Sequence, residues 1–133
     1  MSPAHLHILQ HSLGCDQHGR QAEGYRPNRD DEFGCYRNRY VTSPECPDGL
    51  HCQQLVAQGF MIDHGPQTIA GGMHCYAVTQ AGYDAMRDAS PPPPKLSRSK
   101  RRWQAFRELS DLMDFQQYLT WPGRQAHEQR CGI

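Results

Sequence analysis

The first apolar pattern along the chain predicts a short helix close to its start. Three leucines recur at intervals of three and four residues, which places their side chains on one helix face: Leu6, Leu9 and Leu13. Ser2 is a typical capping residue, Pro3 suits a first helical position, and Gly14 suits a helix end. We therefore expect a helix between Ser2 and Gly14 that packs through one apolar face.

A polar stretch follows this helix. Residues 15–33 are rich in Gly, Arg and Asp and show no apolar period, so they predict a long loop that is mobile unless something holds it. The segment Tyr36–Thr42, around Tyr40 and Val41, predicts a strand or a short extended piece.

The most informative pattern lies at about Cys46–Asp88. Its signals occur in this order: a helix from Pro47 that ends at Gly59, a strand that starts with Phe60-Met61-Ile62, turn signals at Gly65-Pro66 and Gly71-Gly72, a strand at Met73–Val78, and a helix capped by Thr79 that reaches about Arg87. On the last helix, Ala81, Ala85 and Met86 are available for packing. Because a two-stranded ribbon is only marginally stable alone, we expect it to fold back against a helix.

Four consecutive prolines divide the chain. Ser90-Pro91-Pro92-Pro93-Pro94 cannot continue a helix and favours stiff polyproline II. The sequence therefore predicts a body at residues 1–89, a Pro-rich spacer at residues 90–94 and a helical C-terminal extension at residues 95–133.

The extension has its own apolar pattern. Trp103, Phe106, Leu109 and Met113 follow helical spacing, and Asp114 is placed to cap a second short helix. We expect these apolar side chains to pack on the body or on another chain.

Charge is distributed unevenly along the chain. Residues 1–94 carry six arginines, no lysine and ten acidic residues, whereas residues 95–133 carry eight basic and four acidic residues. The two parts therefore have net charges of −4 and +4, a polarity that is typical of an interaction tail.

The cysteines and the first residues bear on where the protein resides. The six cysteines are scattered, the start of the chain lacks the basic and apolar pattern of a secretory signal, and no apolar run is long enough to cross a membrane. We therefore expect reduced thiols and a cytoplasmic protein with no membrane partner.

Two segments resemble a known fold. Leu55–Met61 and Tyr76–Gly82 resemble the end of a winged-helix domain, in which a leucine-rich helix ends at Gly and a wing hairpin leads into a Thr-x-x-Gly helix start. The resemblance implies an α+β, winged-helix-like fold, with helices and a two- to three-stranded antiparallel hairpin, followed here by the C-terminal helical extension.

Three further segments resemble a set of small uncharacterised phage and prophage proteins. They are His7–Gly14, Tyr36–Thr42 and Leu96–Trp103, which recur in that set in this order around the winged-helix piece. The resemblance implies a viral accessory role in the cytoplasm of a host bacterium, and it implies little about mechanism.

The winged-helix segment lacks the usual chemistry of a duplex reader. Such a domain uses basic or amide side chains on one helix and on its wing to reach bases and phosphates. Neither Pro47–Gly59 nor the wing at Asp63–Gly72 contains Arg or Lys. Three glutamines on the helix could read adenine or simply face solvent, and as uncharged side chains they also suit an interface with a protein: Gln53, Gln54 and Gln58.

The extension opens with a basic cluster beside an aromatic residue. The cluster comprises Lys95, Arg98, Lys100, Arg101 and Arg102, followed by Trp103. This combination can hold nucleic acid by charge and stacking, can grip an acidic protein surface, or can be a solvated helix start.

Neither metal binding nor catalysis is predicted. His7 and His11 share a helix face, and His51-Cys52 and His74-Cys75 could converge with Cys46, but no C-x-x-C or H-E-x-x-H motif is present. The pair of Cys52 and His51 needs geometry before it can be judged as a nucleophile and base. No Gly-rich phosphate loop is visible, so we expect no enzyme, no cofactor and no stoichiometric zinc.

These observations favour a non-enzymatic phage accessory protein. Its expected partner is a host protein or ribonucleoprotein complex, for example in an anti-CRISPR type of inhibition of host defence. The alternative is a winged-helix DNA- or RNA-binding regulator that uses the basic C-terminal segment. The sequence does not predict the oligomeric state.

Overall fold

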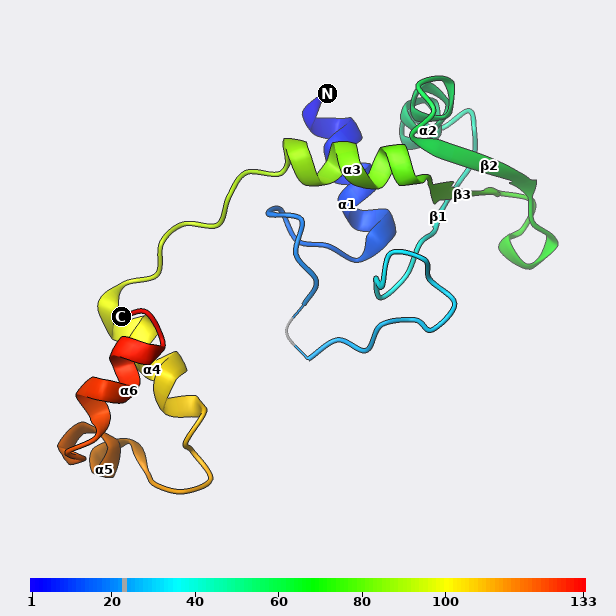
Figure 1. Ribbon diagram of the computed structural model, residues 1–133. Coiled ribbons are helices and arrows are strands. Elements are labelled where there is room, and N and C mark those ends of the chain that lie inside the picture. The colour runs from blue at the N-terminus through cyan, green and yellow to red at the C-terminus, as the bar shows by residue number, and fades with distance from the viewer. Residues whose placement is uncertain (23) are drawn as a thin grey trace. The chain divides into compact units, whose positions relative to one another are not determined.

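The computed structural model describes residues 1–22 and 24–133 (Figure 1). Residue 23, inside the predicted loop 15–33, lies outside the described residues. Over the described part the protein is α+β, with six α-helices and one three-stranded antiparallel sheet. The chain divides into two compact units, Met1–Pro93 and Pro94–Ile133.

Helix α1, Pro3–Leu13, begins and ends as its sequence predicts. The Ser2 side chain accepts a hydrogen bond from the His5 backbone N–H, and Gly14 ends the helix in the left-handed conformation with φ of 71°. Leu9 and Leu13 are fully buried. The helix therefore forms one wall of the core of the first unit.

The sheet of the first unit has the strand order β1-β3-β2. Strand β1, Tyr40–Thr42, pairs with β3, His74–Val78, which also pairs with β2, Met61–Pro66. The register of β2 shifts between Asp63 and Pro66, so the predicted turn at Gly65-Pro66 belongs to the strand. The short 3-10 helix η1, Thr68–Ala70, makes the connection to β3 instead.

One helix precedes the β2–β3 hairpin in the chain and another follows it. The second of them packs closely against the backbone at Phe60. Helix α2, Pro47–Ala57, ends two residues before Gly59, and helix α3, Gln80–Ala89, begins after Thr79, whose hydroxyl accepts from the Gly82 N–H. A Cβ on Gly82 would collide with the Phe60 carbonyl oxygen. Gly82 is thus required by the close approach of α3 to Phe60, in the segment between α2 and β2.

The core of the first unit draws on each of these elements. Ile8, Leu9 and Leu13 of α1 join side chains from the other elements, namely Cys35, Cys52, Leu55, Met61, Tyr76, Val78 and Met86. On α3, Met86 is fully buried, but Ala81 is exposed, so the expected packing role of Ala81 is not realised. Tyr83 takes a place at the edge of the core, where its ring stacks on Phe33 with centroids 4.8 Å apart.

The described part of the predicted loop is anchored at several points. Cys15 forms a β-bridge with Gln21, and the Gln10 amide donates to the Gln17 carbonyl. Phe33 packs against the core beside the buried Cys35. These contacts hold the described part of the loop against the first unit.

The second unit contains three helices. They are α4, Arg98–Arg107, α5, Phe115–Thr120, and α6, Arg124–Arg130. Asp114 caps α5 in a full capping box with Gln117, as its position predicts. Helix α4 ends at Arg107, and residues 108–112 form turns. Leu109 and Met113 therefore lie outside the helix that their spacing predicts.

Aromatic rings fill the centre of the second unit. Phe106 lies 5.2 Å from Phe115 and 5.6 Å from Tyr118 between ring centroids, and Tyr118 is fully buried. Trp103 packs at the edge of this group, 5.2 Å from Phe106. Among the helices of residues 1–22 and 24–133, none is long and apolar enough to cross a membrane.

Candidate functional site

The outer face of the sheet in the first unit carries a group of apolar side chains. Val41 is paired with Cys75, and Ile62 with Ala77, so their four side chains lie on one face while Tyr76 of β3 points into the core. Val41 exposes 40% and Ile62 51% of its surface. We call these four residues the outer sheet face.

The tip of the β2–β3 hairpin also carries exposed apolar side chains. Ile69 in η1 is 99% exposed, and Met73, just before β3, is also exposed. The hairpin contains no Arg or Lys between Met61 and Val78. A phosphate backbone would find no cationic partner there.

The structure places the three predicted helix-interface residues in different settings. Gln53 is half-buried and donates hydrogen bonds to the Asp63 carboxylate and the Tyr76 hydroxyl. Gln54 is exposed, and its amide oxygen lies 2.8 Å from His5 Nε2. Gln58 is exposed at the end of α2. Gln53 is therefore held within the fold, and Gln54 and Gln58 are the two accessible members of the set.

A polar cluster supports the inner side of the hairpin. His74 Nδ1 lies 2.9 Å from an Asp63 carboxylate oxygen, and the Gly65 N–H and Gln53 amide also donate to this carboxylate. Burial alone would raise the pKa of Asp63, but the hydrogen bonds from these three groups outweigh it and lower the pKa. The cluster fixes the hairpin where its register shifts.

The buried cysteines of the first unit are unsuited to nucleophilic chemistry. Cys52 is fully buried, and burial, with smaller contributions from Asp48 and Asp63, raises its pKa to about 12. Burial likewise raises the pKa of Cys35 to about 12. A nucleophilic cysteine requires an accessible thiolate. Cys52, which is next to His51 in the sequence, does not provide one.

The basic cluster of the second unit is only partly available for binding. Lys95, Arg98, Lys100 and Arg101 are exposed. Arg102, in contrast, donates from Nε to a Glu128 carboxylate oxygen at 2.6 Å, and the Glu128 side chain is only 8% exposed. Arg102 therefore connects α4 to α6 through this ion pair and has a structural role.

A groove runs beside the exposed cations. Trp103, which is 49% exposed, lines it together with Leu96, Ser99, Lys100, Gln104 and Arg107, and its volume is about 410 Å³. A half-exposed indole beside a lysine is a suitable platform on which a nucleobase can stack.

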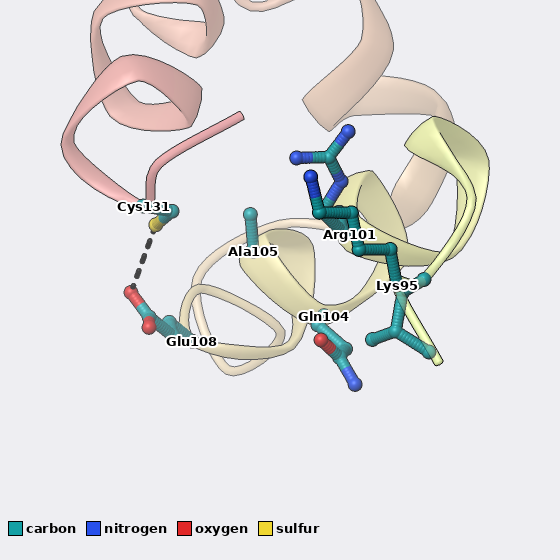
Figure 2. A pocket seen from close by; sticks show the side chains of 7 residues that line it. Lys95, Arg101, Gln104, Ala105, Glu108 and Cys131 are labelled. Atoms are coloured by element: carbon teal, nitrogen blue, oxygen red, sulfur yellow. Dashed lines mark hydrogen bonds between the residues drawn. The ribbon is translucent and has the colours of Figure 1, made fainter. Parts of the chain in front are cut away.

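A second cavity of about 540 Å³ lies along α4. Figure 2 shows Lys95 and Arg101 on one side of it, with Glu108 and Cys131 on the other. The Cys131 thiol donates to Glu108 Oε2 at 3.7 Å. Partial desolvation and the Glu108 carboxylate both raise the pKa of this thiol.

Among the described residues, one group of His, Cys, Asp and Glu side chains has ligand atoms close enough together to hold a metal ion, and it includes this pair. His127 Nε2 lies 3.3 Å from Glu108 Oε2 and 3.9 Å from Cys131 Sγ, and the three ligand atoms lie within 4.8 Å of one another. The histidines and cysteines that the sequence suggests, at positions 7, 11, 46, 51, 52, 74 and 75, form no such cluster in that part of the chain. These three residues do not stand out as a set in the sequence, because Glu108 lies far along the chain from the other two residues.

Comparisons with protein-family models, curated proteins and solved structures find no match to this chain.

Proposed function

We propose that this protein is a non-enzymatic phage accessory protein whose first unit is a winged-helix-like module turned to protein recognition. Its partner is a host protein or ribonucleoprotein complex, and an anti-CRISPR type of antagonism is one example. Two features favour the winged-helix comparison: α2 is followed by Gly59 and the β2–β3 hairpin, and the hairpin leads into the Thr79-x-x-Gly82 start of α3.

The observation that carries this proposal is the outer sheet face. Val41 and Ile62 are exposed β-branched side chains beside Cys75 and Ala77, and α2 and the hairpin contain no Arg or Lys. Burying apolar surface is the main favourable term in protein association, whereas nucleic-acid backbones are bound chiefly by cations. The occupant that fits is an uncharged, apolar surface of a protein.

A matched pair of variants tests the surface. The full chain is immobilised and exposed to bacterial lysate, with and without nuclease, and bound proteins are identified by mass spectrometry. We expect V41K/I62K to lose a nuclease-resistant partner, because a lysine ammonium would have to be desolvated in the interface. The control L112K changes an exposed leucine in the second unit and should retain that partner.

Two results would argue against protein recognition by this face. One is that V41K/I62K and the wild-type chain capture the same proteins to the same extent. The other is that nuclease removes all partners from the wild-type chain. Circular dichroism of both variants establishes that they are folded.

A second candidate function is nucleic-acid binding by the second unit. The groove that contains Trp103 and Lys100 favours it, with Arg98 and Arg101 exposed nearby in α4. Charge and stacking together are the means by which proteins hold single strands without reading sequence.

Salt dependence tests this second candidate. R98A/K100A/R101A should abolish binding of a single-stranded oligonucleotide and reduce the slope of log K against log salt by about 0.7 for each lost phosphate contact. W103A should cost about 1–3 kcal/mol if a base stacks there. Substituting Gln54 and Gln58 should leave binding unchanged; if it abolishes duplex binding instead, α2 is a DNA-reading helix.

A further inference from the structure

A buried histidine in the second unit has one ring nitrogen occupied and the other directed at two further ligands. His127 is 7% exposed, and its Nδ1 lies 3.1 Å from the Tyr118 hydroxyl. Its Nε2 faces Glu108 and Cys131. Metal-binding histidines are held in this way, with the second nitrogen fixed by a hydrogen bond that sets the orientation of the ring.

The separations among the three ligand atoms match those around a tetrahedral metal. With usual zinc bond lengths, a tetrahedral site places N and O about 3.4 Å apart, and S about 3.6 Å from either. The corresponding distances here are 3.3 Å for N to O, 3.7 Å for S to O and 3.9 Å for S to N. A metal ion could therefore be accepted with movements of a few tenths of an ångström.

The backbone provides the three ligands from two helix ends. His127 and Cys131 are four residues apart, so they share one face at the end of α6, and Glu108 follows the last residue of α4. Arg102 and Glu128 join the same two helices by an ion pair. The ligand set thus lies between elements that are already held together.

We propose that Glu108, His127 and Cys131 bind one divalent transition-metal ion of the zinc class. The ligands are a carboxylate oxygen, an imidazole nitrogen and a thiolate, all of which zinc accepts. Glu108 and Cys131 lie in the wall of a cavity (Figure 2), from which a water molecule could supply the fourth ligand. On binding, the Cys131 thiol releases its proton to solvent and the metal takes the thiolate.

A bound metal would add to the stability of the second unit. Its core is a small group of aromatic rings around Phe106 and Tyr118, and an ion that binds only the folded state stabilises that state. A metal between the ends of α4 and α6 would hold the helix that carries Arg98, Lys100 and Arg101. This site is independent of the proposed protein-binding face, since it uses other residues and other chemistry.

Cobalt is the probe that tests the ligand set. Co²⁺ is added to the full chain after chelation and removal of metals, and the absorption spectrum is recorded. We expect one cobalt per chain, intense visible bands of a tetrahedral site, and thiolate-to-cobalt charge transfer in the near ultraviolet. Zn²⁺ should displace the cobalt, because moving from octahedral water to a tetrahedral site costs cobalt ligand-field stabilisation and costs zinc none.

The variants separate this site from other histidines and cysteines. C131S changes an exposed side chain, so the fold should survive, and it should abolish charge transfer and weaken binding at least tenfold. C46S removes another exposed cysteine, and H11Q breaks the His7–His11 pair; neither should alter the spectrum. Y118F keeps the ring but removes the hydroxyl that orients His127, and should weaken binding about 10- to 100-fold.

Stability gives a readout that does not depend on the spectrum. Both tryptophans, Trp103 and Trp121, lie in the second unit, so their fluorescence follows the unfolding of that unit. Zn²⁺ should raise its unfolding midpoint in the wild-type chain and in C46S, but not in C131S. The proposal is overturned if cobalt does not bind, if it binds without charge transfer, or if C131S and C46S respond to metal equally.

Discussion

At the residue scale, Arg102 shows how the same residue type can have different roles within one basic cluster. Arg101 and Arg102 are neighbours in α4, yet Arg101 is exposed while Arg102 is bonded to Glu128, which is almost completely buried. A carboxylate in that position is costly unless a cation compensates it. The role of Arg102 is therefore to compensate the charge of Glu128 within the fold, whereas Arg101 is free to contact a ligand.

Replacing each arginine separates the two roles. R102A should destabilise the second unit by about 2 kcal/mol, because Glu128 is left buried with only the more distant Arg124 at 4.0 Å. R101A should change stability by less than about 0.5 kcal/mol, as is usual for an exposed side chain. Urea unfolding followed by tryptophan fluorescence measures both. Equal effects of the two substitutions would contradict the assigned role of the ion pair.

His11 gives the first unit a pH dependence near neutrality. Burial, Arg37 and His7 lower its pKa from the ordinary value, with Asp48 acting in the opposite direction. The unfolded chain therefore takes up the proton first as pH falls below about 6.5, and the first unit loses stability there. A proton NMR titration of His11 should show a midpoint below 6.5, and H11Q should flatten this part of the stability profile. A midpoint at or above 6.5 would refute this.

At the scale of elements, the packing of α3 against the segment between α2 and β2 depends on one glycine. Ala normally stabilises a helix relative to Gly by about 1 kcal/mol. At Gly82, however, a methyl group would meet the Phe60 carbonyl oxygen and crowd Val78. Backbone cannot yield as a flexible side chain can, so close packing should outweigh helix propensity here.

The sign of the effect is the test at this position. G82A should destabilise the first unit by about 1–3 kcal/mol, the usual cost of overpacking. Thermal unfolding followed by circular dichroism measures it, with A81G as a control at the exposed neighbouring position, where only about 1 kcal/mol of propensity should be lost. A rise in stability for G82A would mean that α3 and the Phe60 backbone are not in close contact.

At the scale of the whole molecule, the two units have separate cores. The core of the first unit uses residues from Ile8 to Met86, and the aromatic core of the second unit uses residues from Trp103 to Trp121. Between α3 and α4, residues 91–97 form no helix or strand. Each unit therefore has its own source of stability.

Removing the second unit tests this division. Residues 1–93 alone should keep their circular dichroism spectrum and should unfold cooperatively, at a midpoint within a few degrees of that of the first unit in the full chain. The reason is that the core residues of the first unit are all retained. A truncated chain with a broad, non-cooperative transition would show that the second unit is needed for the first to fold.

The sequence by itself determined the elements whose signals are local. Ser2 and Gly14 bound α1, Thr79 caps α3, and Asp114 caps α5, because caps depend on hydrogen bonds within a few residues. The helix and strand signals between Cys46 and Asp88 predicted both kinds of element that the α+β class combines. Helix α6 was not predicted, because its buried residues are polar, His127 and Glu128, and they leave no apolar period.

Only the tertiary structure decided which polar residues act together. Sequence cannot separate Arg102 from Arg101, because the difference depends on Glu128 being brought to α4 from another helix. The same holds for Glu108, which meets His127 and Cys131 only after the chain has folded back. The strand register likewise decided that Val41 and Ile62 share one face. Such sets combine residues far apart in the chain, and local propensity carries no information about which distant residues will meet.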